Sequence, residues 1–222
     1  MNDPYTDENG VLLNKLGITD YYELSEAEAD IGFVKIMNVD SLNVDCFDEE
    51  LLKKIHKHIF EDIFNWAGEY RRVPIIKEEL VLPGCSVEYS RYQEISKDLK
   101  KCLIDLNSTS WKNMDISEIA PLFARKLALL WKVHPFRDGN TRTVLSFAYL
   151  YAKEYGFPFD IGIFTEELFR GVAAEGKTIY NIRDKFVLAC LDEEDYPEVQ
   201  YLANVFERAI LHHNINNSRR VK

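Results

Sequence analysis

The sequence predicts an all-α protein with one short β-hairpin. Apolar side chains recur at helical spacing through most of the 222 residues, and Gly or Pro residues separate the resulting segments. Apolar residues make up 46% of the chain and aromatic residues 13%, as in an ordered globule. At this length one domain, with a small helical extension, buries a proper core.

The expected helices follow one another along the chain. Asp20 is a suitable N-cap for the first, Gly68 ends the second, and Gly156 with Pro158 stops the fifth. The second has its apolar face at Leu51, Leu52, Ile55, Ile59 and Ile63. In order, the predicted helices span residues 21–39, 48–67, 91–106, 115–131, 141–155, 165–174, 178–191 and 196–213. We expect residues 1–191 to form the main domain with its N-terminal extension, and 192–222 a C-terminal helix and basic tail.

The segment 70–88 departs from the helical pattern. It contains the apolar runs 72–76 and 80–82, interrupted by Pro74 and by Pro83 with Gly84. This arrangement predicts a short hairpin with an exposed edge, and Lys77 near its tip. The alternative is that the segment is only a connecting loop.

The nine residues 134–142, His-Pro-Phe-Arg-Asp-Gly-Asn-Thr-Arg, are the most informative stretch of the chain. They lie between two apolar helical runs, 119–133 and 144–155, so they form a loop that opens the second helix. The N-terminus of a helix presents unpaired N–H groups and the positive end of its dipole, and therefore binds phosphate.

Each polar residue of this loop has a chemical use. His134 titrates near neutrality and is a candidate general base, and Asp138 is a candidate ligand for Mg²⁺ carried by a nucleotide. Phe136 is expected to anchor the loop to the core. The candidate phosphate-binding residues are Gly139, which allows close backbone approach, Asn140 and Thr141, which add donors, and Arg142, which offers a fork of donors.

These residues resemble the signature of Fic-domain proteins, His-x-Phe-x-(Asp or Glu)-Gly-Asn-Gly-Arg-x-x-Arg. The match includes His134, Pro135, Phe136, Asp138, Gly139, Asn140 and Arg142. Two upstream stretches also look like the family: residues 14–18, and residues 55–71 with the run Trp66-Ala67-Gly68-x-Tyr70-Arg71. The resemblance covers roughly residues 10 to 160, about the size of a single domain.

The resemblance implies transfer of AMP from ATP to a Ser, Thr or Tyr hydroxyl of a target protein, with the chain itself as a further target. His134 would be the general base and Asp138 would hold Mg²⁺. The hairpin would be a flap over the active site that holds the target along residues 72–88 by strand addition. Tyr180 and Asn181 would line an adenine pocket, although they fit equally as ordinary helix residues.

The chain departs from the family pattern at two positions. Thr141 replaces the second glycine, and Leu145 replaces the last arginine. Many members are inhibited by a helix with (Ser or Thr)-x-x-x-Glu-(Gly or Asn), whose glutamate pairs with that arginine. Thr19 with Glu23, and Ser90 with Glu94, have the spacing but not the final residue. We therefore expect the usual self-inhibition to be absent or replaced by a different device.

Two other functions stay open at this stage. One is a related enzyme, either a phosphotransferase of the Doc type, which has a lysine where Thr141 stands, or an enzyme that removes AMP. The other is a nucleotide-binding module of a toxin–antitoxin pair without turnover. A second copy of the chain and an antitoxin are the further candidate partners.

Charge and cysteine spacing argue against several other classes. The net charge of −10 disfavours a nucleic-acid binder. No apolar run is long enough for a signal peptide or a membrane span, so we expect a cytoplasmic protein without a membrane partner. The four cysteines are too far apart for a zinc site or a disulfide framework. The remaining histidines, His56, His58, His212 and His213, are expected to be ordinary helix residues.

Overall fold

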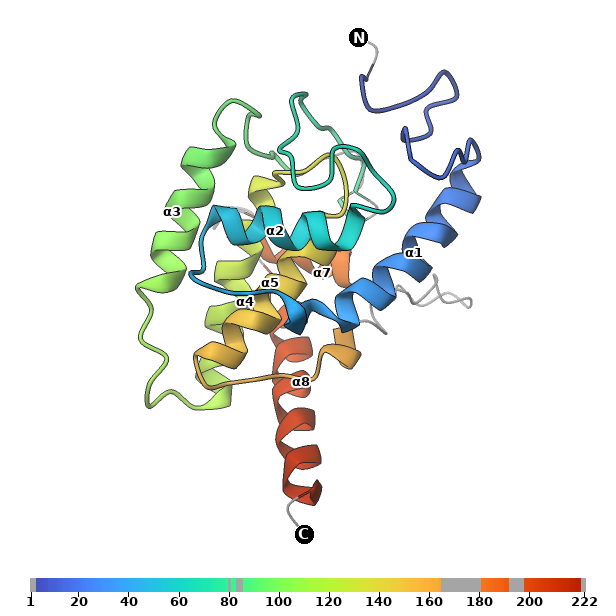
Figure 1. The fold of residues 1–222 in the computed structure, drawn as a ribbon. Helices are drawn as coiled ribbons and strands as arrows, with labels where there is room; N and C mark the ends of the chain where they lie inside the picture. The colour runs from blue at the N-terminus through green and yellow to red at the C-terminus, as the bar shows by residue number, and fades with distance from the viewer. Residues whose placement is uncertain (1–2, 80, 83–85, 165–180, 192–197, 221–222) are drawn as a thin grey trace.

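The computed structural model describes residues 3–79, 81–82, 86–164, 181–191 and 198–220, and the side chains of the last stretch up to residue 214. Within these ranges the fold is helical, as predicted (Figure 1). The helices are α1 (Tyr21–Met37), α2 (Glu49–Phe60), α3 (Ile95–Asn107), α4 (Ile116–Val133), α5 (Asn140–Glu154), α7 (Ile182–Ala189) and α8 (Val199–Arg220), with a short 3₁₀ turn, η1 (Val39–Ser41).

Local capping explains where most of these helices begin. The carboxylate of Asp20 accepts from the amides of Tyr22 and Glu23 at the start of α1, and Asp48 does the same for Glu50 and Leu51 at the start of α2. Asp115 and Glu118 form a reciprocal capping box at the start of α4. These caps satisfy amides that have no partner within the helix.

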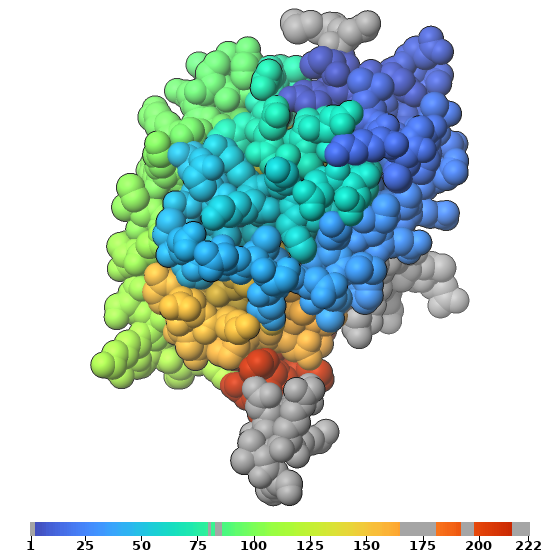
Figure 2. All heavy atoms as spheres, viewed as in Figure 1, coloured from blue at the N-terminus to red at the C-terminus, as the bar shows by residue number. Residues whose placement is uncertain are grey.

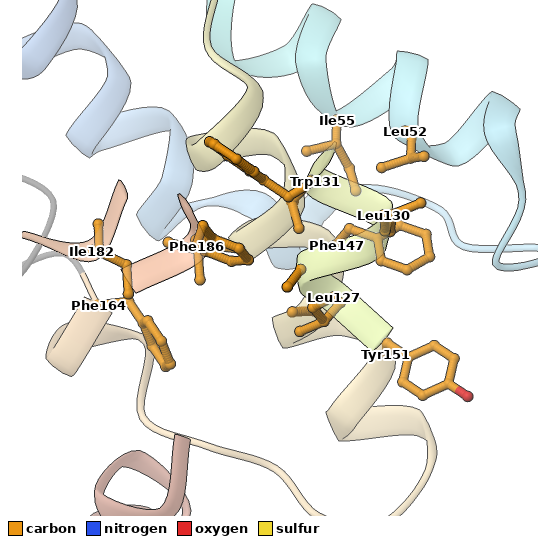
Figure 3. Close-up of a cluster of buried hydrophobic side chains, with 14 of the residues drawn as sticks. Leu52, Ile55, Leu127, Leu130, Trp131, Phe147, Tyr151, Phe164, Ile182 and Phe186 are labelled. Atoms are coloured by element: carbon orange, nitrogen blue, oxygen red, sulfur yellow. The ribbon is translucent and has the colours of Figure 1, made fainter. Parts of the chain in front are cut away.

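Helix α4 is the centre of the fold. Its side chains are buried around most of its circumference, as expected for a helix enclosed by others. Helices α3, α5, α7 and α8 pack against it, and α2 lies across α5. The core brings together Leu52 and Ile55 of α2, Leu127, Leu130 and Trp131 of α4, Phe147 and Tyr151 of α5, and Ile182 and Phe186 of α7 (Figure 3).

The space-filling view shows α1 along one edge of the molecule and α3 along the opposite edge (Figure 2). Between them, α2 and the chain that follows it cover much of the front face. The C-terminal part of α8 extends beyond the other helices (Figure 1). None of the described helices is long and apolar enough to span a bilayer.

The second helix ends earlier than the sequence predicted. Residues 48–67 were expected to be one helix ended by Gly68, but α2 stops at Phe60 and the chain then turns back along it. Ile63 and Phe64 continue the apolar pattern because they are buried in that turn. Gly68 has φ +84° and donates its N–H to Nδ1 of His56 at 2.8 Å. The apolar spacing in the sequence therefore predicted that these residues are buried, but it did not distinguish a helix from a folded-back turn.

The expected hairpin is not seen in the described part of 70–88, which comprises residues 70–79, 81–82 and 86–88 and contains no strand. A two-stranded ribbon is marginally stable unless something else supports it. Here the side chain of Glu79 is buried and accepts from Tyr89 Oη and Arg183 Nη2, each at 2.7 Å. These contacts hold the segment against α7. The helix expected at 165–174 lies outside the described residues.

Candidate active site

The loop between α4 and α5 is closed by its own side chains. The Asn140 amide accepts from the backbone N–H of Phe136 and donates to its carbonyl, both at 2.9 Å. Two left-handed residues bound the loop: His134, with φ 51° at the end of α4, and Gly139, with φ 75° at the start of α5. Asn140 was expected to help bind phosphate, and the structure places its amide within the loop itself.

His56 supports this loop from α2. Its buried ring stacks on Phe136 with a centroid distance of 3.9 Å. Nδ1 accepts from Gly68, so the proton of the neutral ring is on Nε2, which then donates to the carbonyl of Asp138 at 3.1 Å. Burial lowers the pKa of His56 to about 3, which keeps this tautomer neutral. His56 was expected to be an ordinary helix residue, and its contact with the loop is visible only in the tertiary structure.

Gly139 is required for packing. A Cβ at this position would lie 2.3 Å from the ring of Phe60. We expect Gly139→Ala to lower the free energy of unfolding by about 2 to 5 kcal/mol, from left-handed strain and overpacking together. Gly156→Ala is the matched control, because Gly156 also has positive φ (+87°) but no atom within 4 Å. Equal losses in denaturant unfolding would show that contact with Phe60 does not matter.

A cavity of about 640 Å³ opens at the start of α5. It brings together most of the residues predicted from the sequence: Lys77, His134, Asp138, Gly139, Asn140, Thr141, Arg142 and Asn181. It also includes residues that the sequence did not indicate, namely Tyr21, Ser25 and Glu28 of α1, and Arg183 of α7. Tyr180 lies outside the described residues. Because the first-turn amides of a helix have no internal carbonyl partner, α5 directs free donors into this cavity.

His134 is a buried, uncharged base. Its ring packs against Tyr89 and Trp131, at centroid distances of 4.1 and 5.0 Å. Neither ring nitrogen has a hydrogen-bond partner within the described part of the chain. Burial, followed by the positive charges of Lys77 and Arg183, lowers the pKa of His134 well below its usual 6.5. An imidazole in this state accepts a proton from a bound group but does not keep one from solvent.

The protonation state of His134 is directly measurable. Because its pKa is lowered, the ring is neutral at pH 6.5, where an ordinary imidazole is half protonated. We expect ring ¹⁵N shifts in the folded, nucleotide-free protein to stay those of a neutral ring between pH 8 and 6. In denaturant the same ring should titrate near 6.5. Half-protonation near pH 6.5 in the folded protein would contradict this environment.

Asp138 is held ionised by neighbouring donors. Burial opposes ionisation, but Lys77, Arg142 and the amide of Gly139 outweigh it and hold the pKa of Asp138 well below its usual value. The Gly139 N–H lies 2.6 Å from Oδ1, and Nζ of Lys77 lies 3.9 Å from the same oxygen. No group of three metal-binding side chains occurs in the described residues. Three carboxylates line the cavity, those of Glu28, Glu78 and Asp138, and Asp138 is the one within the loop at the start of α5.

Arg142 is engaged by Glu28 of α1. Its Nη2 donates to Oε2 of Glu28 at 2.7 Å, and the guanidinium carbon lies 4.5 Å from the centroid of the Phe60 ring. Burial raises the pKa of Glu28, although Arg142 opposes the shift. Glu28 does not fit the inhibitory motif, because Leu24 rather than Ser or Thr stands four residues before it. Leu24, Glu28, Gly32 and Ile36 form the buried stripe of α1, so the tertiary structure is what brings Glu28 to the cavity.

Thr141 and Leu145, the two residues that depart from the Fic signature, lie in different environments. Thr141 Oγ1 accepts from Nε1 of Trp131 at 3.0 Å, so the indole of α4 fixes this hydroxyl at the cavity wall. Leu145 is buried in the core, where the pattern has an arginine. The cavity therefore receives Arg142 from the start of α5, with no second arginine from position 145.

Comparison with known proteins agrees with this geometry. Residues 46–152 match the sequence model of the Fic/DOC family. The chain is 32% identical over 161 residues to the protein adenylyltransferase VbhT of Bartonella schoenbuchensis, covering 72% of this chain and 32% of VbhT. It is 28% identical over 154 residues to the probable protein adenylyltransferase y4lH of Sinorhizobium fredii, covering 68% of this chain and 74% of that protein. The chain thus spans about a third of the length of VbhT.

Solved structures share the fold. BepC of Bartonella tribocorum, crystallised with AMPPNP, aligns with a TM-score of 0.69 and 23% identity, over 92% of this chain and 94% of that one. The N-terminal Fic domain of an effector from Bartonella quintana, crystallised with ADP, aligns with a TM-score of 0.70 and 22% identity, over 92% of each chain. At this identity the likeness is one of fold.

Proposed function

Because residues 46–152 belong to the Fic/DOC family, we propose that this chain is a protein adenylyltransferase that moves AMP from ATP to a hydroxyl side chain of a target protein. One observation carries the proposal. A buried, uncharged His134 opens onto the cavity at the start of α5, beside Asp138 and Arg142. A base, a phosphate site and a cation ligand are thus within one cavity, as nucleotidyl transfer requires.

In the proposed reaction His134 accepts the proton of the target hydroxyl. The hydroxyl oxygen forms a bond to the α-phosphorus of ATP, the bond from that phosphorus to the bridging oxygen breaks, and pyrophosphate leaves. The first-turn amides of α5 and the guanidinium of Arg142 stabilise negative charge on the phosphates. For Arg142 to do so, it must exchange Glu28 for the nucleotide.

Asp138 is the proposed ligand for Mg²⁺. Mg²⁺ commonly binds through one or two carboxylates together with substrate phosphates, and a single ionised Asp138 fits that pattern. When bound, the metal would neutralise phosphate charge. Lys77, which faces the same carboxylate, would then contact the nucleotide instead.

The proposed target site is the segment 72–88 beside the cavity. Ile76 is 87% exposed, and the described part of the segment has no strand partner. An extended peptide from a target could pair with such backbone. Asn181, at the start of α7, lines the cavity. We propose that Asn181 and Tyr180 together contact the adenine ring.

Mass spectrometry tests the proposed transfer. After incubation with ATP and Mg²⁺, we expect an AMP adduct on the chain itself or on a protein of a bacterial lysate. A phosphate adduct would favour the Doc-like phosphotransferase, which has less support because Thr141 is not a lysine. Loss of AMP from a previously modified protein would favour the reverse activity. Nucleotide binding without any adduct would favour the toxin–antitoxin module.

A further inference from the structure

Arg71 is a buried cation whose partners are all backbone carbonyls. The residue is 2% exposed. Nε donates to the carbonyl of His134 at 2.8 Å, Nη1 to that of Val73 at 2.8 Å, and Nη2 to that of Ser90. Its own N–H donates to the carbonyl of Pro135 at 2.9 Å. One side chain and its amide thus bind four separate points of the backbone.

This arrangement has a cost that simple packing does not require. Burying a charge is unfavourable unless it is paired or fully hydrogen-bonded. No carboxylate of the described residues forms an ion pair with Arg71. Burial accordingly lowers its pKa. The fork of the guanidinium is instead used to hold three carbonyls in fixed relative positions.

The three carbonyls belong to two parts of the site. Val73 and Ser90 lie at the two ends of one segment. Within it, Lys77 and Glu78 line the cavity, and Tyr89 packs on the ring of His134. The third carbonyl is that of His134, whose left-handed backbone (φ 51°) is uncommon for a residue other than glycine. The guanidinium therefore joins both ends of this segment to the peptide of the base.

We propose that Arg71 is a positioning residue that aligns residues 73–90, which include most of the proposed target site 72–88, with the base His134. The inference rests on the proposed function, because it gives that segment and that histidine their roles. Arg71 does not line the cavity, and apart from its charge, which helps to lower the pKa of His134, it acts on the reaction through the groups that it holds. A displacement of about 1 Å between reacting groups typically costs about 100-fold in rate.

Arg71→Lys tests the proposal, because lysine keeps the charge but loses the planar fork. We expect kcat for AMP transfer to fall by about 10- to 100-fold. The Kd for ATP should stay within about twofold of wild type, because the start of α5 is untouched. Arg125→Lys is the matched control: Arg125 is an exposed residue of α4 that does not line the cavity, so this variant should leave kcat unchanged. A weakened ATP affinity with unchanged kcat would overturn the proposal.

A second control separates positioning from stability. Leu106→Ala removes a buried side chain of α3, far from the cavity, and should lower the melting temperature at least as much as Arg71→Lys. We expect it to keep kcat when assayed well below its melting temperature. If kcat falls equally in both variants, Arg71 is merely structural and the proposal fails.

Hydrogen–deuterium exchange supplies a readout that does not depend on activity. In Arg71→Lys, amides of 73–79 and of 134–136 should exchange faster together, while those of α3 are unchanged. If the variant does not fold, the same coupling is measurable in the wild type, where the two segments should open in one step as denaturant is raised. Independent opening would overturn the proposal. A wild type that transfers no AMP but shows coupled exchange would instead overturn only the proposed function.

Discussion

Replacing His134 with alanine is expected to abolish AMP transfer and leave ATP binding nearly unchanged. The ring is the one buried imidazole that opens onto the cavity among the described residues, and its nitrogens have no competing partner there. Loss of a general base typically lowers the rate by about 100- to 10,000-fold. The phosphates are expected to be held by α5 and Arg142, so calorimetry should give a similar Kd for ATP in both proteins.

Two controls sharpen this experiment. His58→Ala removes a histidine of α2 that contacts the carbonyl of Lys35, outside the cavity, and should leave transfer intact. His134→Asn, which keeps a polar group without a useful base, should be as inactive as the alanine variant. Transfer by His134→Ala at more than a tenth of the wild-type rate would exclude His134 as the base.

Replacing Glu28 with glutamine is expected to increase both ATP affinity and automodification. In the free chain Glu28 occupies the donors of Arg142 and adds a negative charge to the cavity where phosphates would bind. Glutamine has almost the same volume but no charge, so Arg142 becomes available to the nucleotide. We expect a gain of tenfold or more, which corresponds to about 1.4 kcal/mol. Calorimetry and the rate of AMP adduct formation measure the two effects separately.

Glu23 and Glu94 provide the matched controls for Glu28. Both are exposed, both have the spacing of the inhibitory motif, and neither lines the cavity. Glu23→Gln and Glu94→Gln should therefore change automodification little. If all three variants behave like wild type, Glu28 does not restrain the site. If Glu28→Gln lowers ATP affinity, the ion pair instead holds Arg142 in place for the nucleotide.

The structure changes the view of regulation that the sequence suggested. Leu145 cannot form the ion pair of the inhibitory motif. The sequence therefore predicts that the usual self-inhibition is absent or replaced by a different device. Glu28 is our candidate for the different device, since it pairs with the arginine that remains. Because α1 carries Glu28, movement of α1 away from α5 would free Arg142. The Glu28→Gln experiment measures the effect of breaking this pair without moving the helix.

The sequence alone determined the features that depend on neighbours along the chain. The starts of α1, α2 and α4 could be predicted because Asp20, Asp48 and Asp115 cap amides two or three residues away. The active-site loop could be predicted because its polar residues are contiguous and helical runs enclose it. Local periodicity failed where burial came from a turn, at residues 61–67, and where the described residues 72–79 and 81–82 form no strand.

Tertiary structure alone decided which distant groups meet at the site. Glu28 reaches Arg142 across 114 residues, His56 reaches the carbonyl of Asp138 across 82, and Arg71 reaches that of His134 across 63. Such pairs have no characteristic spacing, and two of them join a side chain to a backbone carbonyl, which every residue possesses. The first two meet because α1 packs on α2 and α2 packs on α5, and that packing is set by the shape of the whole core.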